Sequence, residues 1–475
     1  MGFDREVVRD PAGAGFGVAG EARGLVAAAA RGMGELGRVR GQLRECARRL
    51  DEPLRVALAG QLKAGKSTLL NALVGQDIAP TDATECTRLV TWYRDGAAPR
   101  VTAWSGDGAR ADVVVRRGRG AEGLPGAHGL SFDLSALRWN APGPREVDHL
   151  AVEWSSSELA RMTIIDTPGI SSLSHEVSAR TSRLLTPSGN GVALPSADAV
   201  LYLLRRLDND DVDFLERIGS MSGSGGSSGP LGVIGVVSRA DEIGAGRIDA
   251  LHSARDVASR FAGELERTGL CQSVIPVAGL LAFAATSLRQ REFAAFEALA
   301  AVPVEDLSVA MLSVDRFARE DPTLGVPAEL RAHLAARFGM FGIRLAVTLI
   351  RLGVRDSQTL ARELIGRSGL DELRTVLDVQ FAQRAEELKA HSALTSLARI
   401  IVANPGTPAD TLLPRVKTLL SDVHGFAELR LLGHLRTDEI PLPANDLVDM
   451  HRLIGGAGVA AHVRLGLPAH TDLHT

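Results

Sequence analysis

Eight consecutive residues have the types and the spacing needed to hold a polyphosphate. The run Gly60-Gln61-Leu62-Lys63-Ala64-Gly65-Lys66-Ser67 fits the pattern GxxxxGK(S/T). The glycines let backbone N–H groups wrap around phosphates, the lysine reaches the β- and γ-phosphates, and the serine binds Mg²⁺. The residues expected to contact a nucleotide here are Gly60, Lys63, Ala64, Gly65, Lys66, Ser67 and Thr68.

The neighbours of this run indicate how it is held in place. The apolar residues Val56–Ala59 precede it, and Leu69-Leu70-Asn71-Ala72-Leu73 follow it. This context predicts a buried strand, a phosphate loop and an amphipathic helix whose N-terminus adds positive electrostatic potential. It favours a phosphate site over a glycine-rich turn without a ligand.

A second acidic motif follows another apolar run. Residues Met162–Ile165 lead directly into Asp166-Thr167-Pro168-Gly169, which fits the pattern DxxG. In such a switch Asp166 holds Mg²⁺ through water, and the N–H of Gly169 contacts the γ-phosphate. By itself the motif is also compatible with an ordinary turn.

A third motif indicates which base the nucleotide carries. Val233–Val237 run into Ser238-Arg239-Ala240-Asp241, at the position of the guanine-reading element (N/T)KxD. Asp241 would accept hydrogen bonds from guanine N–H groups that adenine cannot supply. Ser238 and Arg239 depart from the usual pair, but they keep a small hydroxyl and a long stem that can lie on the base. Further along, Ala278 lies where a backbone N–H would meet the guanine carbonyl, a weak signal by itself.

Composition limits the classes of function. The chain has 475 residues, which predicts two or three domains. Its 53 basic and 57 acidic residues give a net charge of −4, which argues against a dominant nucleic-acid surface. Three scattered cysteines indicate a reducing cytosol. The N-terminus lacks a signal-peptide layout, and Phe338–Val354 carries arginines that favour an amphipathic over a transmembrane helix.

The pattern along the chain predicts an α/β fold. Apolar periodicity indicates one long helix over residues 20–50, and from about residue 328 the pattern is helical. Between them, apolar strand candidates recur with helical stretches between several of them, the rhythm of a doubly wound, mostly parallel sheet. Residues 105–148 are expected to form a surface insertion. The expected strands are 56–59, 89–93, 162–165, 199–204, 233–237 and 274–277.

The motifs together resemble those of the dynamin superfamily. The string Pro-Thr-Asp-Ala-Thr-Glu-Cys-Thr-Arg over residues 80–88 and Ser-Arg-Ala-Asp-Glu-Ile-Gly over residues 238–244 carry the likeness. The chain is similar to bacterial dynamin-like proteins, in particular the isoniazid-inducible dynamin-like GTPases of mycobacteria. The resemblance covers roughly residues 20–400.

The resemblance implies a domain plan and further site residues. It implies an N-terminal neck helix (1–50), a GTPase domain (51–382) and a C-terminal helical neck or short stalk (383–475). Thr87 would bind Mg²⁺ and place the attacking water, with Thr84 as the alternative. Lys63 lies where guanylate-binding proteins and atlastins place an arginine, so it would supply positive charge for catalysis. The alternative is a solvated loop lysine.

The implied activity is Mg²⁺-dependent hydrolysis of GTP to GDP and phosphate, with Lys63, Lys66 and Thr87 in catalysis and Ser67, Thr87 and Asp166 at the metal. The resemblance also implies pairing across the nucleotide face, with a second copy or with another dynamin-like protein. A cytoplasmic location follows, with peripheral contact at the inner face of the plasma membrane left open. The alternatives are a slow nucleotide-gated scaffold and a ribosome or RNA assembly GTPase, which the near-neutral charge counts against.

Overall fold

The chain folds into two compact units. The computed structural model describes residues 17–33, 37–80, 89–119, 125–135, 137–141, 143, 145–169, 197–220, 232–246, 249–267, 271, 273–435 and 442–469. The smaller unit holds the chain up to Glu52 together with Arg384–Ala427. The larger unit holds Pro53–Gln383 together with Glu428–Thr475.

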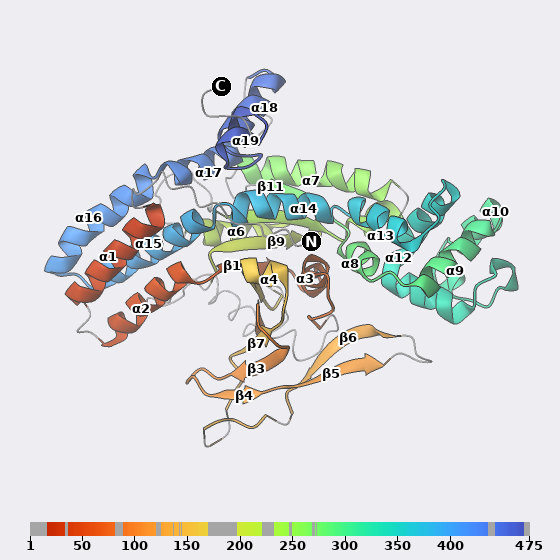
Figure 1. The fold of residues 1–475 in the computed structure, drawn as a ribbon, viewed down its shortest axis with the longest axis horizontal. Coiled ribbons are helices and arrows are strands. Elements are labelled where there is room, and N and C mark those ends of the chain that lie inside the picture. Colours follow the sequence, from red (N-terminus) through yellow and green to blue (C-terminus); the bar gives the residue numbers. More distant parts are fainter. Residues whose placement is uncertain are drawn as a thin grey trace, which may run out of the picture. The chain divides into compact units, whose positions relative to one another are not determined.

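A nine-stranded sheet forms the centre of the larger unit, in the order β11-β10-β9-β1-β8-β2-β7-β3-β4 (Figure 1). A separate two-stranded sheet pairs β5 with β6. The strands are β1 Leu54–Gly60, β2 Val90–Arg94, β3 Arg100–Trp104, β4 Arg110–Asp112, β5 Val114–Arg119, β6 Pro125–Asp133, β7 His149–Glu153, β8 Met162–Asp166, β9 Ala199–Leu204, β10 Val233–Ser238 and β11 Ser273–Val277.

The half of the sheet that carries the nucleotide motifs is parallel. Strands β11, β10, β9, β1 and β8 pair in parallel, and all seven residues of β1 are buried. A central strand covered on both faces needs a continuous apolar run, which explains the composition of β1. All six strands expected from the sequence are present, and the doubly wound, mostly parallel sheet is confirmed.

Beyond β8 the sheet changes direction. Strand β2 pairs antiparallel with β8, and β7 then pairs parallel with β2 and antiparallel with β3. The expected insertion supplies β4 and the β5–β6 pair, which extends beyond β3 and β4 in Figure 1.

Some helices of the larger unit pack on the sheet, and others pack on one another. Helix α7 packs on β10 and β11, and α14 also packs on β11. The helical elements are α3 Lys66–Val74, α4 Ser157–Arg161, α6 Asn209–Ser220, η3 Ala240–Gly246, α7 Ala250–Arg267, α8 Gly279–Thr286, α9 Gln290–Ala301, α10 Val304–Ala310, α11 Val314–Phe317, η4 Pro322–Leu324, α12 Ala328–Arg351, α13 Ser357–Gly366, α14 Leu370–Leu377, the π-helix η5 Asp378–Ala382, α18 Ala444–Leu453 and α19 Ala461–Leu465.

Helices α8, α9, α12 and α13 form an apolar core of their own, in which Phe296 and Phe338 meet edge to face. Helix α12 bends at Gly339, whose φ is 63°. Among the described residues α12 is also the one helix long and apolar enough to cross a membrane, but 61% of that apolar window is buried within the protein. This degree of burial is typical of the core helix of a globular domain.

The smaller unit is a helical bundle of α1 Val18–Met33, α2 Gly37–Asp51, α15 Ala385–Ala403 and α16 Thr407–Asp422. The expectation of one helix over residues 20–50 is wrong, because α1 and α2 are separate helices that pack on each other. Gly32 and Gly37 flank the break, and glycine is among the least favourable residues inside a helix.

Helix α17, His424–His434, runs from one unit into the other, because the division falls after Ala427. Residues from Glu428 onward therefore group with the larger unit, and Arg464 of α19 forms an ion pair with the buried Glu428.

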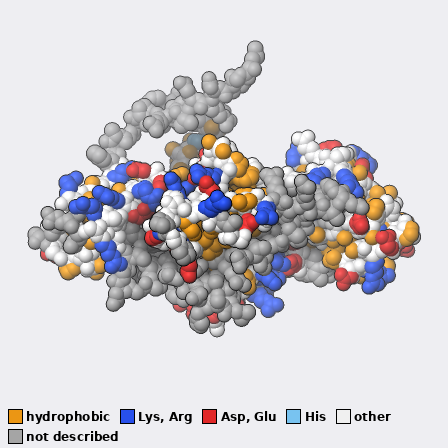
Figure 2. Space-filling model, turned by 90° about the horizontal axis from the view of Figure 1, so that it is seen from below, with side chains coloured by type: hydrophobic (Ala, Val, Ile, Leu, Met, Phe, Trp, Pro, Cys, Tyr) orange, Lys and Arg blue, Asp and Glu red, His pale blue; other side chains and the backbone are white. Residues whose placement is uncertain are grey.

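On the face drawn in Figure 2, basic and acidic side chains are interspersed among the residues shown in colour.

Candidate nucleotide-binding site

The phosphate loop joins β1 to α3 and depends on two glycines. Gly60 has φ 143°, and a Cβ there would lie 2.5 Å from the carbonyl oxygen of Leu203. Gly65 has φ 92° and precedes the first turn of α3. Both values lie in the region that favours glycine, so the loop needs glycine at these two positions.

The ammonium group of Lys66 lies inside this loop. Its Nζ donates to the carbonyl oxygens of Gly60 and Gln61, each at 3.0 Å. Burial lowers the pKa of Lys66, and the nearby Asp166 carboxylate opposes that shift. A cation held by two loop carbonyls can exchange them for phosphate oxygens, which are stronger acceptors.

Ser67 and Asp166 meet at the start of α3 and the end of β8. Ser67 Oγ donates to Asp166 Oδ2 at 2.8 Å, while the buried Oδ1 accepts no hydrogen bond within the described residues. Burial raises the pKa of Asp166, and Lys66 and Ser67 oppose that shift. A hydroxyl and a carboxylate with an unpartnered oxygen are the donor set that a divalent cation such as Mg²⁺ accepts.

No group of three or more His, Cys, Asp or Glu side chains with metal-site geometry occurs in the part of the chain that the structure describes. Ser67 and Asp166 supply two oxygen ligands, and Mg²⁺ commonly takes its other ligands from phosphate and water.

The DxxG segment lies directly against the phosphate loop. Thr167 donates to the carbonyl of Leu58 from its backbone N–H at 3.2 Å and from its hydroxyl at 2.7 Å. A Cβ on Gly169 would lie 2.6 Å from Cα of Leu62. Gly169 must therefore be glycine for the switch segment to reach the loop.

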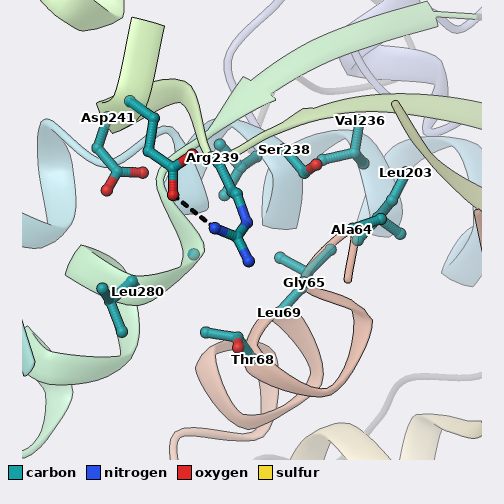
Figure 3. Close-up of a pocket in the computed structure, with 13 residues that line it drawn as sticks. Ala64, Gly65, Thr68, Leu69, Leu203, Val236, Ser238, Arg239, Asp241 and Leu280 are labelled. Atoms are coloured by element: carbon teal, nitrogen blue, oxygen red, sulfur yellow. Dashed lines mark hydrogen bonds and ion pairs between the residues drawn. The ribbon is translucent and has the colours of Figure 1, made fainter. Parts of the chain in front are cut away.

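One pocket connects the phosphate loop to the motif after β10 (Figure 3). Its lining residues are Ala64, Gly65, Thr68, Leu69, Leu203, Val236, Ser238, Arg239, Asp241, Glu242, Val277, Gly279 and Leu280. Within it Asp241 is only 7% exposed, and its Oδ1 has no hydrogen-bond partner among the described residues. Burial raises the pKa of Asp241.

Ser238 and Arg239 have different surroundings in this pocket. Ser238 Oγ donates to the carbonyl of Leu204, which ties it to the neighbouring strand. Arg239 Nη1 pairs with Glu242 at 2.6 Å, and Nη2 donates to the carbonyl of Lys63 at 3.2 Å. The guanidinium of Arg239 therefore lies between the phosphate loop and η3, as Figure 3 shows.

Lys63 and Arg239 share an unusual backbone conformation. Their φ angles are 61° and 53°, and within the described residues all other positive φ angles belong to glycines. Such conformations are strained for ordinary side chains and tend to occur at functional sites. The side chain of Lys63 is exposed.

Ala278 does not line the pocket. Its N–H donates to the carbonyl of Ser368 at 2.8 Å, and the neighbouring Val277, Gly279 and Leu280 line the pocket instead. Thr84 and Thr87 lie outside the described residues.

The sequence patterns missed three kinds of site residue. Leu203 and Val236 line the pocket from strand interiors, and Glu242 binds Arg239. Gly339, at the bend of α12, lies close enough that a Cβ there would be 3.6 Å from Asp241 Oδ2. A glycine inside an otherwise regular helical pattern was the available signal for this contact.

Comparison with known proteins identifies the family. Residues 56–237 match the Dynamin family. Isoniazid-induced protein IniC of Mycobacterium tuberculosis, in strains CDC 1551 / Oshkosh and ATCC 25618 / H37Rv, is 52% identical over 425 residues, 89% of this chain and 82% of the relative. A bacterial dynamin-like protein of Nostoc punctiforme is 44% identical over 48 residues, 10% of this chain and 7% of that protein. The chain belongs to the dynamin family.

Two solved chains are described as an oligomerised bacterial dynamin pair that senses and tethers membranes over long range. They are 12% identical, with TM-scores of 0.27 and 0.31, and they cover 87% and 93% of this chain and 91% and 63% of their own lengths. At these TM-scores the likeness adds nothing to the assignment, which rests on the sequence relatives. The chain is a bacterial dynamin-like GTPase, as its motifs predicted, and is similar to the mycobacterial isoniazid-induced protein.

Proposed function

We propose that this chain hydrolyses GTP to GDP and phosphate at the phosphate loop and the adjoining pocket of Figure 3, with Mg²⁺ as cofactor. One observation carries the proposal. One pocket joins Ala64 and Gly65 of the phosphate loop to the buried carboxylate of Asp241. The cavity that would hold a base at Asp241 therefore reaches the loop that would hold the phosphates.

Asp241 supplies the preference for guanine. An ionised carboxylate accepts hydrogen bonds from the ring N–H and the exocyclic amine of guanine, and both groups are missing at these positions in adenine. Asp241 Oδ1 has no partner among the residues that the structure describes, which supports this role, because a buried acceptor without a donor costs free energy that a bound guanine would recover.

Lys66, Ser67 and Asp166 act at the phosphate end. Lys66 would exchange the carbonyls of Gly60 and Gln61 for phosphate oxygens and so hold the β- and γ-phosphates. Ser67 would hold Mg²⁺ directly and Asp166 would hold it through water. When bound, Mg²⁺ would neutralise the charge that develops on the phosphate oxygens. Gly169 would contact the γ-phosphate, and Thr87, or alternatively Thr84, would complete the metal site and place the attacking water.

Lys63 supplies an additional positive charge to the transition state. Its exposed side chain extends from a strained position of the phosphate loop, three residues before Lys66. A cation fixed at this point would stabilise charge that develops as the bond to the γ-phosphate breaks.

The test of the whole assignment is a switch of base. Asp241→Asn should weaken GTP binding by on the order of 10²-fold or more, because the amide presents a donor to the guanine N–H groups, and should move preference toward xanthosine triphosphate. Asp256→Asn is the matched control, since it makes the same change at an exposed carboxylate of α7 that does not line the pocket. Titrations with GTP, ATP and xanthosine triphosphate decide the matter. A wild-type protein that binds ATP and GTP equally would contradict the proposal.

The helical bundle acts as a neck that responds to the nucleotide. In this proposal residues 51–382 form the GTPase domain, and residues 1–50 and 383–475 form the neck or short stalk. The bundle of α1, α2, α15 and α16 is the neck, and residues from Glu428 onward group with the larger unit. Within the bundle, Lys389 donates to the carbonyls of Leu50 and Glu52, so α15 holds the end of α2. GTP-dependent pairing, with a second copy or another dynamin-like protein, would drive the movement. Sedimentation velocity with a non-hydrolysable GTP analogue tests it, and no change in self-association would rule out a homodimer.

The protein would act in the cytoplasm, with peripheral contact at the inner face of the plasma membrane. Co-sedimentation with liposomes, with and without the same analogue, tests this location. A chain that remains in the supernatant under both conditions would contradict membrane contact.

A further inference from the structure

Gln61, the second residue of the phosphate loop, is held through its side chain by the start of α6. Its Nε2 donates to Asp208 Oδ2 at 2.8 Å and lies 3.2 Å from Asp211 Oδ2, a second acceptor. Its backbone carbonyl accepts from Lys66 Nζ at 3.0 Å. One residue therefore connects the ammonium group inside the loop to a helix that follows β9.

The same two aspartates cap α6. The N–H of Asp208 donates to Asp211 Oδ2 at 3.3 Å, and the N–H of Asp211 donates to Asp208 Oδ1 at 3.1 Å. This reciprocal arrangement is that of a capping box, which fixes the first turn of a helix. The acceptors for Gln61 are therefore held in place by the helix itself.

A tyrosine on the neighbouring strand fixes the inner aspartate. Tyr202 OH donates to Asp211 Oδ1 at 2.6 Å. Tyr202 belongs to β9 and pairs in register with Ala59, the residue before the loop begins. The group of Gln61, Tyr202, Asp208 and Asp211, here called the loop brace, thus connects the start of the phosphate loop, strand β9 and helix α6.

Capping α6 does not require all of these contacts. A cap needs one side-chain acceptor for a helix N–H and usually stands at the surface. Asp211 is 1% exposed, and burial raises its pKa to about 6, with Asp208 and Tyr202 as the titratable groups that act on it. Burying a carboxylate is costly unless donors surround it, and one of the donors here is the amide of Gln61.

We propose that the loop brace is a positioning device that holds the phosphate loop in its nucleotide-binding conformation. The inference rests on the proposed function and deepens it. A loop that is already ordered loses less conformational entropy when phosphate binds, so the brace should increase affinity for guanine nucleotides. Because the loop meets the phosphates in the ground state and in the transition state alike, the brace should lower KM and leave kcat nearly unchanged.

The experiment measures the Kd of a fluorescent GDP analogue for the full chain and two single variants. Gln61→Leu removes the amide, and Asp208→Ser keeps a good N-cap for α6 but shortens the side chain that reaches Gln61. Each should raise Kd roughly tenfold, the effect expected for a lost hydrogen bond to a charged group. Asp210→Asn, an exposed charge change in the same turn of α6, is the matched control and should leave Kd unchanged.

A double-mutant cycle separates positioning from simple capping. If Asp208 acts through Gln61, the double variant should bind no more weakly than Gln61→Leu alone. Steady-state kinetics should place both single effects in KM. Circular dichroism verifies folding, and if Gln61→Leu does not fold, Asp208→Ser with its control carries the test.

Wild-type Kd in the Asp208→Ser variant, additive effects in the cycle, or a loss confined to kcat would overturn the loop brace. A wild-type protein that binds no guanine nucleotide is a different result and would overturn the proposed function itself.

Discussion

The phosphate end and the base end of the candidate nucleotide site differ in how their polar groups are satisfied. At the phosphate end Lys66 is bonded to two loop carbonyls, and Ser67 is bonded to Asp166. At the base end Asp241 Oδ1 is buried without a partner among the described residues. Binding of phosphate therefore exchanges existing hydrogen bonds, whereas binding of guanine adds new ones.

The difference indicates how affinity and selectivity are divided between the two ends. An exchange of hydrogen bonds gives a small net gain in free energy, so charge and geometry must supply the strength at the phosphate end. A new bond to a buried acceptor removes a desolvation penalty that only a ligand with the right donor can remove. The phosphate end should therefore control turnover, and the base end should control which nucleotide enters.

The largest effect is expected from the charge at the phosphate end. Lys66→Ala removes the ammonium group that would hold the β- and γ-phosphates, and Ser67→Asn removes the hydroxyl that would bind Mg²⁺. Either change should abolish GTP turnover, a loss on the order of 10³-fold or more in kcat/KM. Release of inorganic phosphate measures it. Substantial residual hydrolysis would mean that the phosphates bind elsewhere.

A smaller loss is expected from Lys63. Lys63→Ala should lower kcat by on the order of 10²-fold and leave nucleotide affinity nearly intact, because the charge it meets develops mainly as the phosphoryl bond breaks. Lys63→Arg should keep much of the activity, since the positive charge remains.

The cation in the buffer tests the same point without a mutation. If Lys63 replaces a bound monovalent cation, turnover should be the same in K⁺ and in Na⁺. A Lys63→Ala enzyme with wild-type kcat, or a wild type that requires K⁺, would make Lys63 an ordinary surface residue.

The sequence predicted the phosphate end better than the base end, for physical reasons. The conformation of the loop at Gly60 and Gly65 follows from local geometry, and so its eight-residue pattern is informative without any tertiary context. The apolar run of β1 similarly identified a central strand. Asp241 was found because it follows an apolar strand at a fixed spacing.

Contacts between distant segments could not be predicted from local patterns. Gly339 approaches Asp241 from a helix almost a hundred residues further along the chain. Ala278 has its N–H bonded to Ser368, which only the packing of α13 and α14 determines. The contact of Gln61 with Asp208 and Asp211 likewise depends on the pairing of β1 with β9. The break between α1 and α2 had a local signal in Gly32 and Gly37. The helical spacing of apolar residues continues on both sides of them, and it favoured a single helix.

The smallest expected effect is a pH dependence confined to the base end. Burial raises the pKa of Asp241 above its ordinary value, so the carboxyl takes up a proton more readily than a free aspartate. Guanine donates to the ionised form, and binding should therefore favour loss of that proton. Affinity for guanine should be constant above the raised pKa and should weaken as the pH falls through it, by at most about tenfold per pH unit.

Guanosine isolates this effect, because it carries no phosphate and cannot reach Lys66 or Asp166. The affinity for guanosine should fall from neutral to mildly acidic pH, and ligand-observed NMR measures it. Pyrophosphate fits only the phosphate end, so the pH dependence of its affinity reflects Lys66 and the protonation of pyrophosphate itself. Asp256→Asn, an exposed change outside the pocket, should keep the pH dependence for guanosine, and Asp241→Asn should remove it because the amide does not titrate. If guanosine binds Asp241→Asn and the wild type with the same pH profile, the carboxyl of Asp241 does not contact the base. Base selectivity would then have to come from other residues.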